Sequence, residues 1–167
     1  MMPPKLILAP IDFSDPSRNA LNVAADMASR FGASLLLVHI VPAVADLPAG
    51  VSIFKEGEYD KGLHDTAAKQ LADLGAPISG KGVSVRTEIG TANDIGMEIV
   101  RIAASENADM IVIATHGMTG WRKIAFGSVA EKVVQQAECP VLVLRTKAAE
   151  QSVSKSGTPA SSSATAR

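Results

Sequence analysis

Short runs of branched apolar residues alternate along the chain with longer segments of helical periodicity. The apolar runs are predicted strands, and they cover Lys5–Ile11, Ser34–Val41, Val83–Ile89, Met110–Ala114 and Val141–Leu144. Four of them are almost continuously apolar, which is typical of strands buried on both faces of a parallel sheet. Val83–Ile89 alternates polar and apolar residues, so we expect this strand at an edge.

Four helices are predicted between the strands, because apolar residues recur there at helical spacing over Ala20–Phe31, Leu63–Leu74, Ile95–Ala103 and Val129–Ala137. In the first helix, Asp15 is the expected N-cap, Pro16 occupies the first turn and Gly32 ends the helix. Gly75 is the expected end of the second helix, and Pro140 stops the fourth. Strands and helices in strict alternation predict an open α/β sheet.

The candidate chemistry lies where the predicted strand order reverses. Ligands of open α/β sheets bind beyond the carboxyl ends of the strands at this point. If the strand order is 3-2-1-4-5, the first and fourth strands flank it, and they continue into Pro10–Ser14 and Ala114–Gly117. Beyond the fourth strand lie Gly120 and the pair Gly127–Ser128, which opens the fourth helix.

This glycine-containing segment suits a phosphate group. Glycines allow close approach of the backbone, and a helix start offers N–H groups and a positive dipole. The hydroxyl of Ser128 could add a donor. In the alternative interpretation, Ser128 only caps its own helix and the glycines only form turns. The chain has neither GxxxxGK[ST] nor GxGxxG after its first strand, so P-loop hydrolysis and dinucleotide redox chemistry have no support.

At this segment the sequence resembles the universal stress protein family, whose nucleotide-binding members carry G-x2-G-x9-G-[S/T] after the fourth strand. The corresponding stretch is Ala114-Thr115-His116-Gly117, the nine residues MTGWRKIAF, and Gly127-Ser128, so alanine stands at the first glycine position. The resemblance extends over about residues 5–145 and includes ILAPIDFSDPSRNAL, HIV, GTANDI and SVAEKVVQQAECPVLVLR.

The resemblance implies a Rossmann-like open five-stranded parallel sheet of order 3-2-1-4-5, with helices on both faces. It also implies homodimers and binding of ATP, or of AMP or ADP, with Mg²⁺ or Mn²⁺ on the phosphates. In ATP-binding relatives, positions matching Asp12 and Val41 meet the adenine side, while the glycine segment meets ribose and phosphates. The expected nucleotide-binding residues are Pro10, Ile11, Asp12, Val41, Ala114, His116, Gly117, Gly120, Gly127, Ser128 and Val129.

Three functions remain open at this point. The first is nucleotide binding in a stress response, without efficient turnover. The second is slow ATP hydrolysis, in which Asp12 or His116 would position water. The third is a nucleotide-free, chaperone-like interaction dimer. Asp12 could also serve only to cap the turn before the first helix, and Arg122 and Lys123 could contact phosphates or only solvent.

Composition narrows the partners of the chain. Its 167 residues carry a net charge of −1, and a pI of about 6.3 is a poor match for nucleic acid or an anionic membrane surface. The longest apolar run, Leu35–Val41, is far shorter than the ~20 residues of a membrane span. A single cysteine, Cys139, excludes an intramolecular disulfide, and it is expected to be a small buried packing residue. We therefore expect a cytoplasmic protein.

The chain is expected to divide into a folded domain and a C-terminal tail. Residues 1–145 are expected to form one domain, and the Ser/Ala-rich residues 146–167 are expected to be a disordered tail. Val141–Leu144 would be an apolar edge strand without proline or lysine, which invites pairing. Its own copy across a two-fold axis is the simplest partner, so we expect a homodimer through this strand.

Overall fold

The structure is a computed structural model that describes residues 3–43, 56–115 and 127–145, with the backbone alone for 56–60. Its elements follow the chain in the order β1 (Leu6–Pro10), α1 (Asp15–Phe31), β2 (Ser34–Val41), α2 (Glu56–Ser79), β3 (Val85–Thr91), α3 (Ile95–Ser105), β4 (Met110–Ala114), α4 (Ser128–Gln136) and β5 (Val141–Leu144). All strand pairs are parallel. The sheet order is β3-β2-β1-β4-β5, which confirms the expected fold and the edge position of β3.

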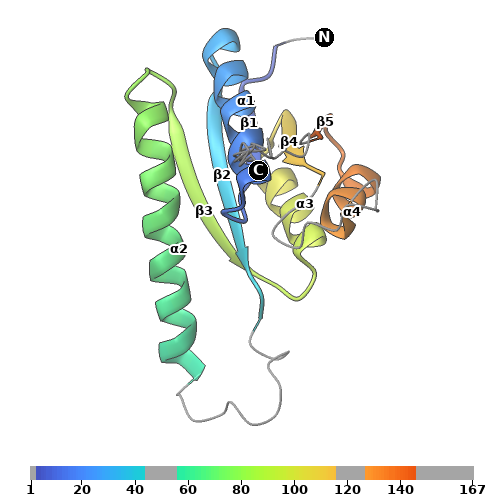
Figure 1. The fold of residues 1–167 in the computed structure, drawn as a ribbon. Coiled ribbons are helices and arrows are strands. Elements are labelled where there is room, and N and C mark those ends of the chain that lie inside the picture. The colour runs from blue at the N-terminus through green and yellow to red at the C-terminus, as the bar shows by residue number, and fades with distance from the viewer. Residues whose placement is uncertain (1–2, 44–55, 116–126, 146–167) are drawn as a thin grey trace, which may run out of the picture.

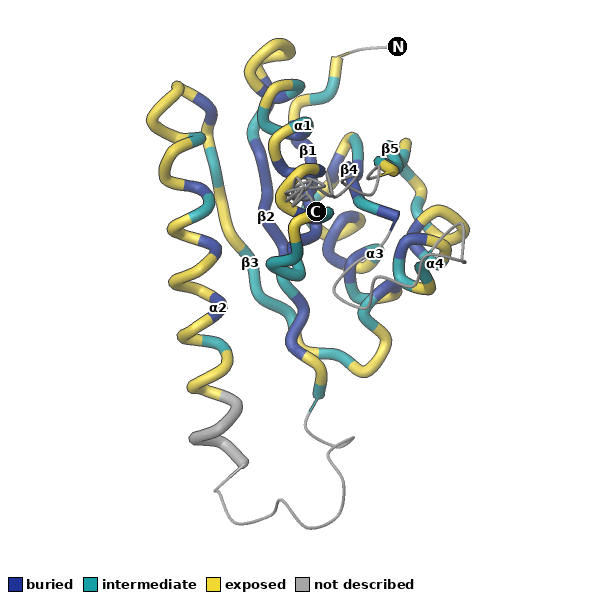
Figure 2. Tube along the Cα trace, viewed as in Figure 1, coloured by how far each residue is buried: buried dark blue, intermediate teal, exposed yellow. Residues whose placement is uncertain are grey.

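Helices cover both faces of the sheet (Figure 1). Side chains of α1 and α2 form one core cluster with the strands, and those of α3 and α4 form a second cluster on the opposite face. The central strand β1 is buried along its whole length, and the buried residues gather on the central strands (Figure 2). None of the described helices is both long and apolar enough to cross a membrane.

The ends of α1 show which local signals set its bounds. Gly32 ends the helix in the left-handed conformation, with φ 66°, as expected from the sequence. The N-cap is Ser14, whose side chain accepts a hydrogen bond from the N–H of Ser17. The expected N-cap Asp15 is instead the first helical residue, where its negative charge lies at the positive end of the helix dipole.

The predicted end of the second helix was wrong. Helix α2 continues through Gly75 and Pro77 to Ser79. A Cβ atom at Gly75 would lie 3.1 Å from Cγ1 of Val85, so this glycine lets the helix pack closely on β3. Tertiary packing therefore decides the role of Gly75, and α2 ends two residues after Pro77, whose ring disfavours a longer helix.

The topology opens a crevice at the middle of the sheet. After β1 the chain turns into α1 on one face, whereas after β4 it reaches α4 on the other face. Since β1 and β4 are neighbours, the segments that follow them leave the sheet on opposite faces. This is the point at which open α/β sheets bind ligands.

Candidate functional site

A pocket of about 370 Å³ lies at the carboxyl ends of the central strands. Its volume falls within the range of about 300–1,000 Å³ that is usual for small-molecule sites. The lining residues come from β1, β2, β4 and the helices beside them: Pro10, Ile11, Asp12, Ser17, Val38, His39, Ile40, Ile95, Ile99, Ile113, Ala114, Thr115, Gly127, Ser128, Val129 and Ala130.

One side of the pocket is apolar. Ile95 and Ile99 reach it from α3, while Val38, Ile40 and Ile113 reach it from β2 and β4. Most of these side chains also belong to the core cluster on this face of the sheet. Such a wall is suited to a flat, weakly polar group such as a nucleobase.

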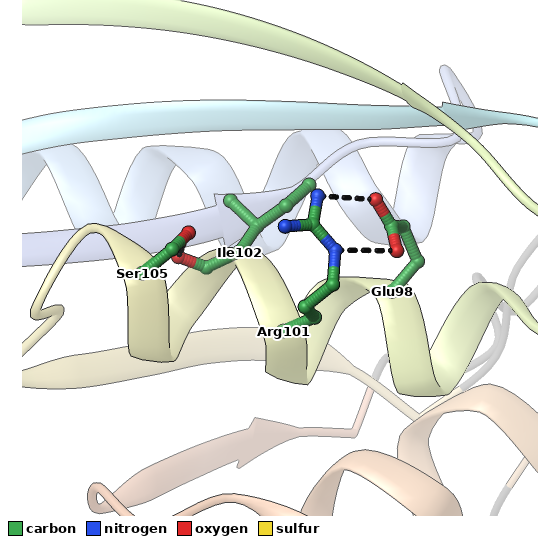
Figure 3. A network of polar contacts seen from close by, with 4 residues as sticks. All are labelled: Glu98, Arg101, Ile102 and Ser105. Atoms are coloured by element: carbon green, nitrogen blue, oxygen red, sulfur yellow. Dashed lines mark hydrogen bonds and ion pairs between the residues drawn. The ribbon is translucent and has the colours of Figure 1, made fainter.

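Helix α3, which supplies part of this wall, is fixed at its polar surface. Arg101 donates from Nε and Nη2 to the two carboxylate oxygens of Glu98, at 2.9 and 2.7 Å, as Figure 3 shows. The Arg101 guanidinium lowers the pKa of the Glu98 carboxyl. At the start of the helix, Asp94 accepts a hydrogen bond from the N–H of Met97, which caps the first turn.

The opposite side of the pocket is the start of α4. Gly127 is the N-cap, and its N–H donates to the carbonyl of Thr115 at 2.7 Å. Ser128 is thus the first helical residue, and the N-cap Gly127 has no side chain that could cap the helix, so the alternative in which Ser128 caps α4 was wrong. Helix geometry leaves the N–H groups of Ser128, Val129 and Ala130 without a partner inside the helix, which is the arrangement that binds anions.

Asp12 orders the turn before α1 and is also a lining residue of the pocket. Its Oδ1 accepts hydrogen bonds from the N–H and the hydroxyl of Ser14, at 3.1 and 2.5 Å, so it orders the turn before α1. It also lines the pocket.

The other expected residues divide into three groups. Pro10, Ile11, Ala114, Gly127, Ser128 and Val129 line the pocket together with Asp12. Val41 is buried at the end of β2 and is not among the lining residues; its carbonyl accepts a hydrogen bond from Ala92 N at 3.1 Å. His116, Gly117, Gly120, Arg122 and Lys123 lie outside the described residues.

Comparison with known proteins identifies the family. The model of the universal stress protein family matches residues 4–145. The chain belongs to the universal stress protein family. It is 33% identical over 144 residues to universal stress protein MJ0531 of Methanocaldococcus jannaschii, covering 84% of this chain and 82% of the relative.

Solved structures of universal stress proteins and related chains share its fold. Hypothetical protein MJ0577 of Methanocaldococcus jannaschii has a TM-score of 0.77 at 28% identity, over 89% of this chain and 99% of that one. A universal stress protein from Archaeoglobus fulgidus, in complex with dAMP, has a TM-score of 0.57 at 25% identity, over 86% and 98% of the two chains.

Several pocket residues of this universal stress protein were not predicted from the sequence. Val38, Ile40, Ile95, Ile99 and Ile113 look like ordinary core positions in the sequence, because an apolar pattern does not separate a pocket wall from a core. His39 interrupts an apolar strand, and this break in the pattern was the one available signal for a polar residue at the site.

The alanine at the first glycine position of the family motif is compatible with the backbone. Ala114 closes β4 and is paired with Leu144 of β5. Among the described residues other than glycine, positive φ angles occur at Phe13 and Asn107 alone. The strand conformation at Ala114 is therefore one that any residue adopts, and its methyl group is the whole difference from glycine.

No group of three or more His, Cys, Asp or Glu residues with metal-binding geometry occurs in the part of the chain that the structure describes. Cys139 packs half-buried against the core cluster of α3 and α4, and burial raises the pKa of its thiol.

Proposed function

We propose that this universal stress protein binds an adenine nucleotide, ATP or its products ADP and AMP, in the pocket between β1 and β4. The observation that carries the proposal is that an apolar wall and the start of α4, whose N-cap Gly127 has no side chain, line one pocket. These two surfaces match the two ends of a nucleotide, which are an apolar base and an anionic phosphate chain. The complex of the Archaeoglobus fulgidus relative with dAMP supports the same ligand class.

The polarity of the pocket orients the ligand. The base lies against Ile95 and Ile99, with Asp12 toward the nucleoside. The phosphates lie at the N–H groups of Ser128 and Val129, where the positive end of the α4 dipole favours negative charge. The carboxylate of Asp12 would repel phosphates, which supports this orientation over the reverse one. Mg²⁺ or Mn²⁺ would bind the phosphate oxygens, as hard cations do.

The protein acts, in this proposal, as a cytoplasmic stress-response protein through binding and signalling rather than through efficient catalysis.

The proposed assembly is a homodimer joined through β5. The four residues of this edge strand are apolar and half-buried, whereas the edge strand β3 carries Arg86, which forms an exposed ion pair with Glu106. Charged side chains on an edge strand oppose its pairing with another chain. We therefore place the dimer interface at β5 rather than at β3.

Titration calorimetry with ATP and Mg²⁺ tests the binding proposal. Ser128→Ala should weaken binding by about 1.5–3 kcal/mol, the contribution of one hydrogen bond to a charged group. Gly127→Val should abolish it by filling the phosphate position, and Ala114→Gly should leave it equal or tighter. Ser105→Ala is the matched control, because Ser105 Oγ donates only to the carbonyl of Ile102 on α3.

The same protein preparations separate this proposal from its alternatives. Mass spectrometry of the denatured wild type should detect bound adenine nucleotide. Release of phosphate in stoichiometric excess would indicate the slow ATPase instead. If the wild type shows no binding heat up to about millimolar ATP, which corresponds to about −4 kcal/mol, the nucleotide-free interaction dimer replaces the proposal.

A further inference from the structure

His39 is the one residue of the pocket that breaks the apolar pattern of β2. It lines the pocket, and its Nδ1 lies 2.7 Å from the carbonyl oxygen of Ile11. Because a carbonyl oxygen only accepts hydrogen bonds, Nδ1 carries the proton and donates. The His39 side chain on β2 thereby binds the main chain of Ile11, directly after β1.

This hydrogen bond lies where the main-chain ladder between β1 and β2 ends. The paired residues run from Leu6 with Ser34 to Pro10 with Val38. One further main-chain bond joins Ile11 N to Val38 O at 2.7 Å. The imidazole of His39 then supplies the donor for the carbonyl of Ile11, so β2 holds both polar groups of this residue.

The next part of the turn is held by the same imidazole. Phe13 has φ 64°, a conformation that is strained for a bulky residue and persists where its surroundings hold it. The rings of Phe13 and His39 lie 4.6 Å apart at an interplanar angle of 42°. His39 therefore contacts the residues on both sides of Asp12.

We propose that His39 is a positioning residue that fixes the Ile11–Phe13 turn through its Nδ1–H, and thereby presents Asp12 to the bound nucleotide. The inference rests on the proposed function for the identity of the ligand, but the positioning of the turn is independent of it. His39 acts through Ile11 and Phe13, and the hydrogen-bond donor is the essential part of its side chain.

Two substitutions separate the donor from the rest of the imidazole. His39→Asn places an amide N–H near the position of Nδ1, whereas His39→Leu keeps a side chain of similar size without a donor. We expect His39→Leu to weaken ATP–Mg²⁺ binding about tenfold, the effect of losing one hydrogen bond in an ordered site. His39→Asn should stay within about threefold of the wild type. Leu71→Val, on the buried face of α2, is the control for loss of stability without change at the turn.

Hydrogen exchange gives a measurement that needs no ligand. The amides of Ile11 and Ser14 are bonded to Val38 O and to Asp12 Oδ1, and both should exchange faster in His39→Leu but not in His39→Asn or Leu71→Val. Failure of the wild type to bind nucleotide would overturn the proposed function, and exchange would then decide the positioning role alone. Equal exchange in His39→Leu and wild type overturns the inference, as does a His39→Asn protein that behaves like His39→Leu.

Discussion

Lys132 Nζ lies 2.5 Å from Oδ2 of Asp94, so an ion pair joins α4 to the residue that caps α3. The hydrogen bond from Lys132 lowers the pKa of Asp94. Directly beside this pair, Gly96 allows the two helices to approach, because a Cβ atom there would lie 2.9 Å from Cβ of Lys132. The start of α4, where we place the phosphates, is thus positioned by contacts with α3.

We expect Gly96→Ala to move α4 and to destabilise the protein. Overpacking costs about 1–3 kcal/mol, and the better helix propensity of alanine returns up to about 1 kcal/mol. The net loss should be up to about 2 kcal/mol in urea unfolding, with weaker ATP binding. Gly62→Ala on α2 is the control, since an added Cβ there would have no atom of another described part of the fold within 4 Å. Equal stability of the two variants would contradict the close packing of α3 on α4.

Proline at Val143 should convert the proposed dimer into monomers. Ile111 N donates to Pro140 O and Thr115 N donates to Leu144 O, and parallel ladders use alternate residues. The N–H of Val143 therefore points away from β4, toward the open edge. Val143→Pro removes this donor while the bonds to β4 remain. Sedimentation should show monomers for Val143→Pro and dimers for Val143→Ala; a dimer in both would place the interface elsewhere.

Acid should weaken the attachment of β1 to the start of β4. Asp109 Oδ2 accepts hydrogen bonds from the N–H groups of Leu6 and Lys5 at 2.9 and 2.8 Å, and these bonds lower the pKa of Asp109 from its usual 3.8. Because the folded pKa is the lower one, the stabilisation is complete above the usual pKa and is lost as pH falls through the folded value.

The corresponding variant is Asp109→Asn. Urea unfolding should find it less stable than the wild type at about pH 7, and the difference should shrink at a pH below the folded pKa, where the carboxylate is protonated. Asp26→Asn, on the exposed side of α1, controls for the change in net charge. A difference of the same size at both pH values would mean that the charge on Asp109 contributes nothing.

Removal of residues 146–167 should leave the fold and nucleotide binding unchanged. These residues are rich in serine and alanine without an apolar period, and the family model ends at residue 145. A segment without a buried face contributes little to stability. Thermal unfolding and calorimetry of the shortened chain test this, and a drop in Tm of more than a few degrees would show that the segment packs on the domain.

The sequence patterns predicted the fold more fully than the site. Buried parallel strands are recognisable because both of their faces are apolar, and the alternation of β3 marked it as an edge. Gly75 was misjudged as a helix end because its role is to let α2 approach Val85, a contact that local sequence does not reveal. For the same reason His39 was missed, since its partner Ile11 lies 28 positions away.

The central position of β1 has a consequence for synthesis of the chain. One flank of β1 pairs with β2, which follows soon after it, while the other pairs with β4 and is tied to Asp109, 103 positions beyond Leu6. In a nascent chain that has not yet reached Asp109, the edge of β1 that will pair with β4 therefore has no partner strand. Such flanks promote aggregation, and pairings over long sequence separation form slowly. A pause of the ribosome before Asp109 would therefore leave unpaired one edge of a strand that is buried along its whole length in the folded protein.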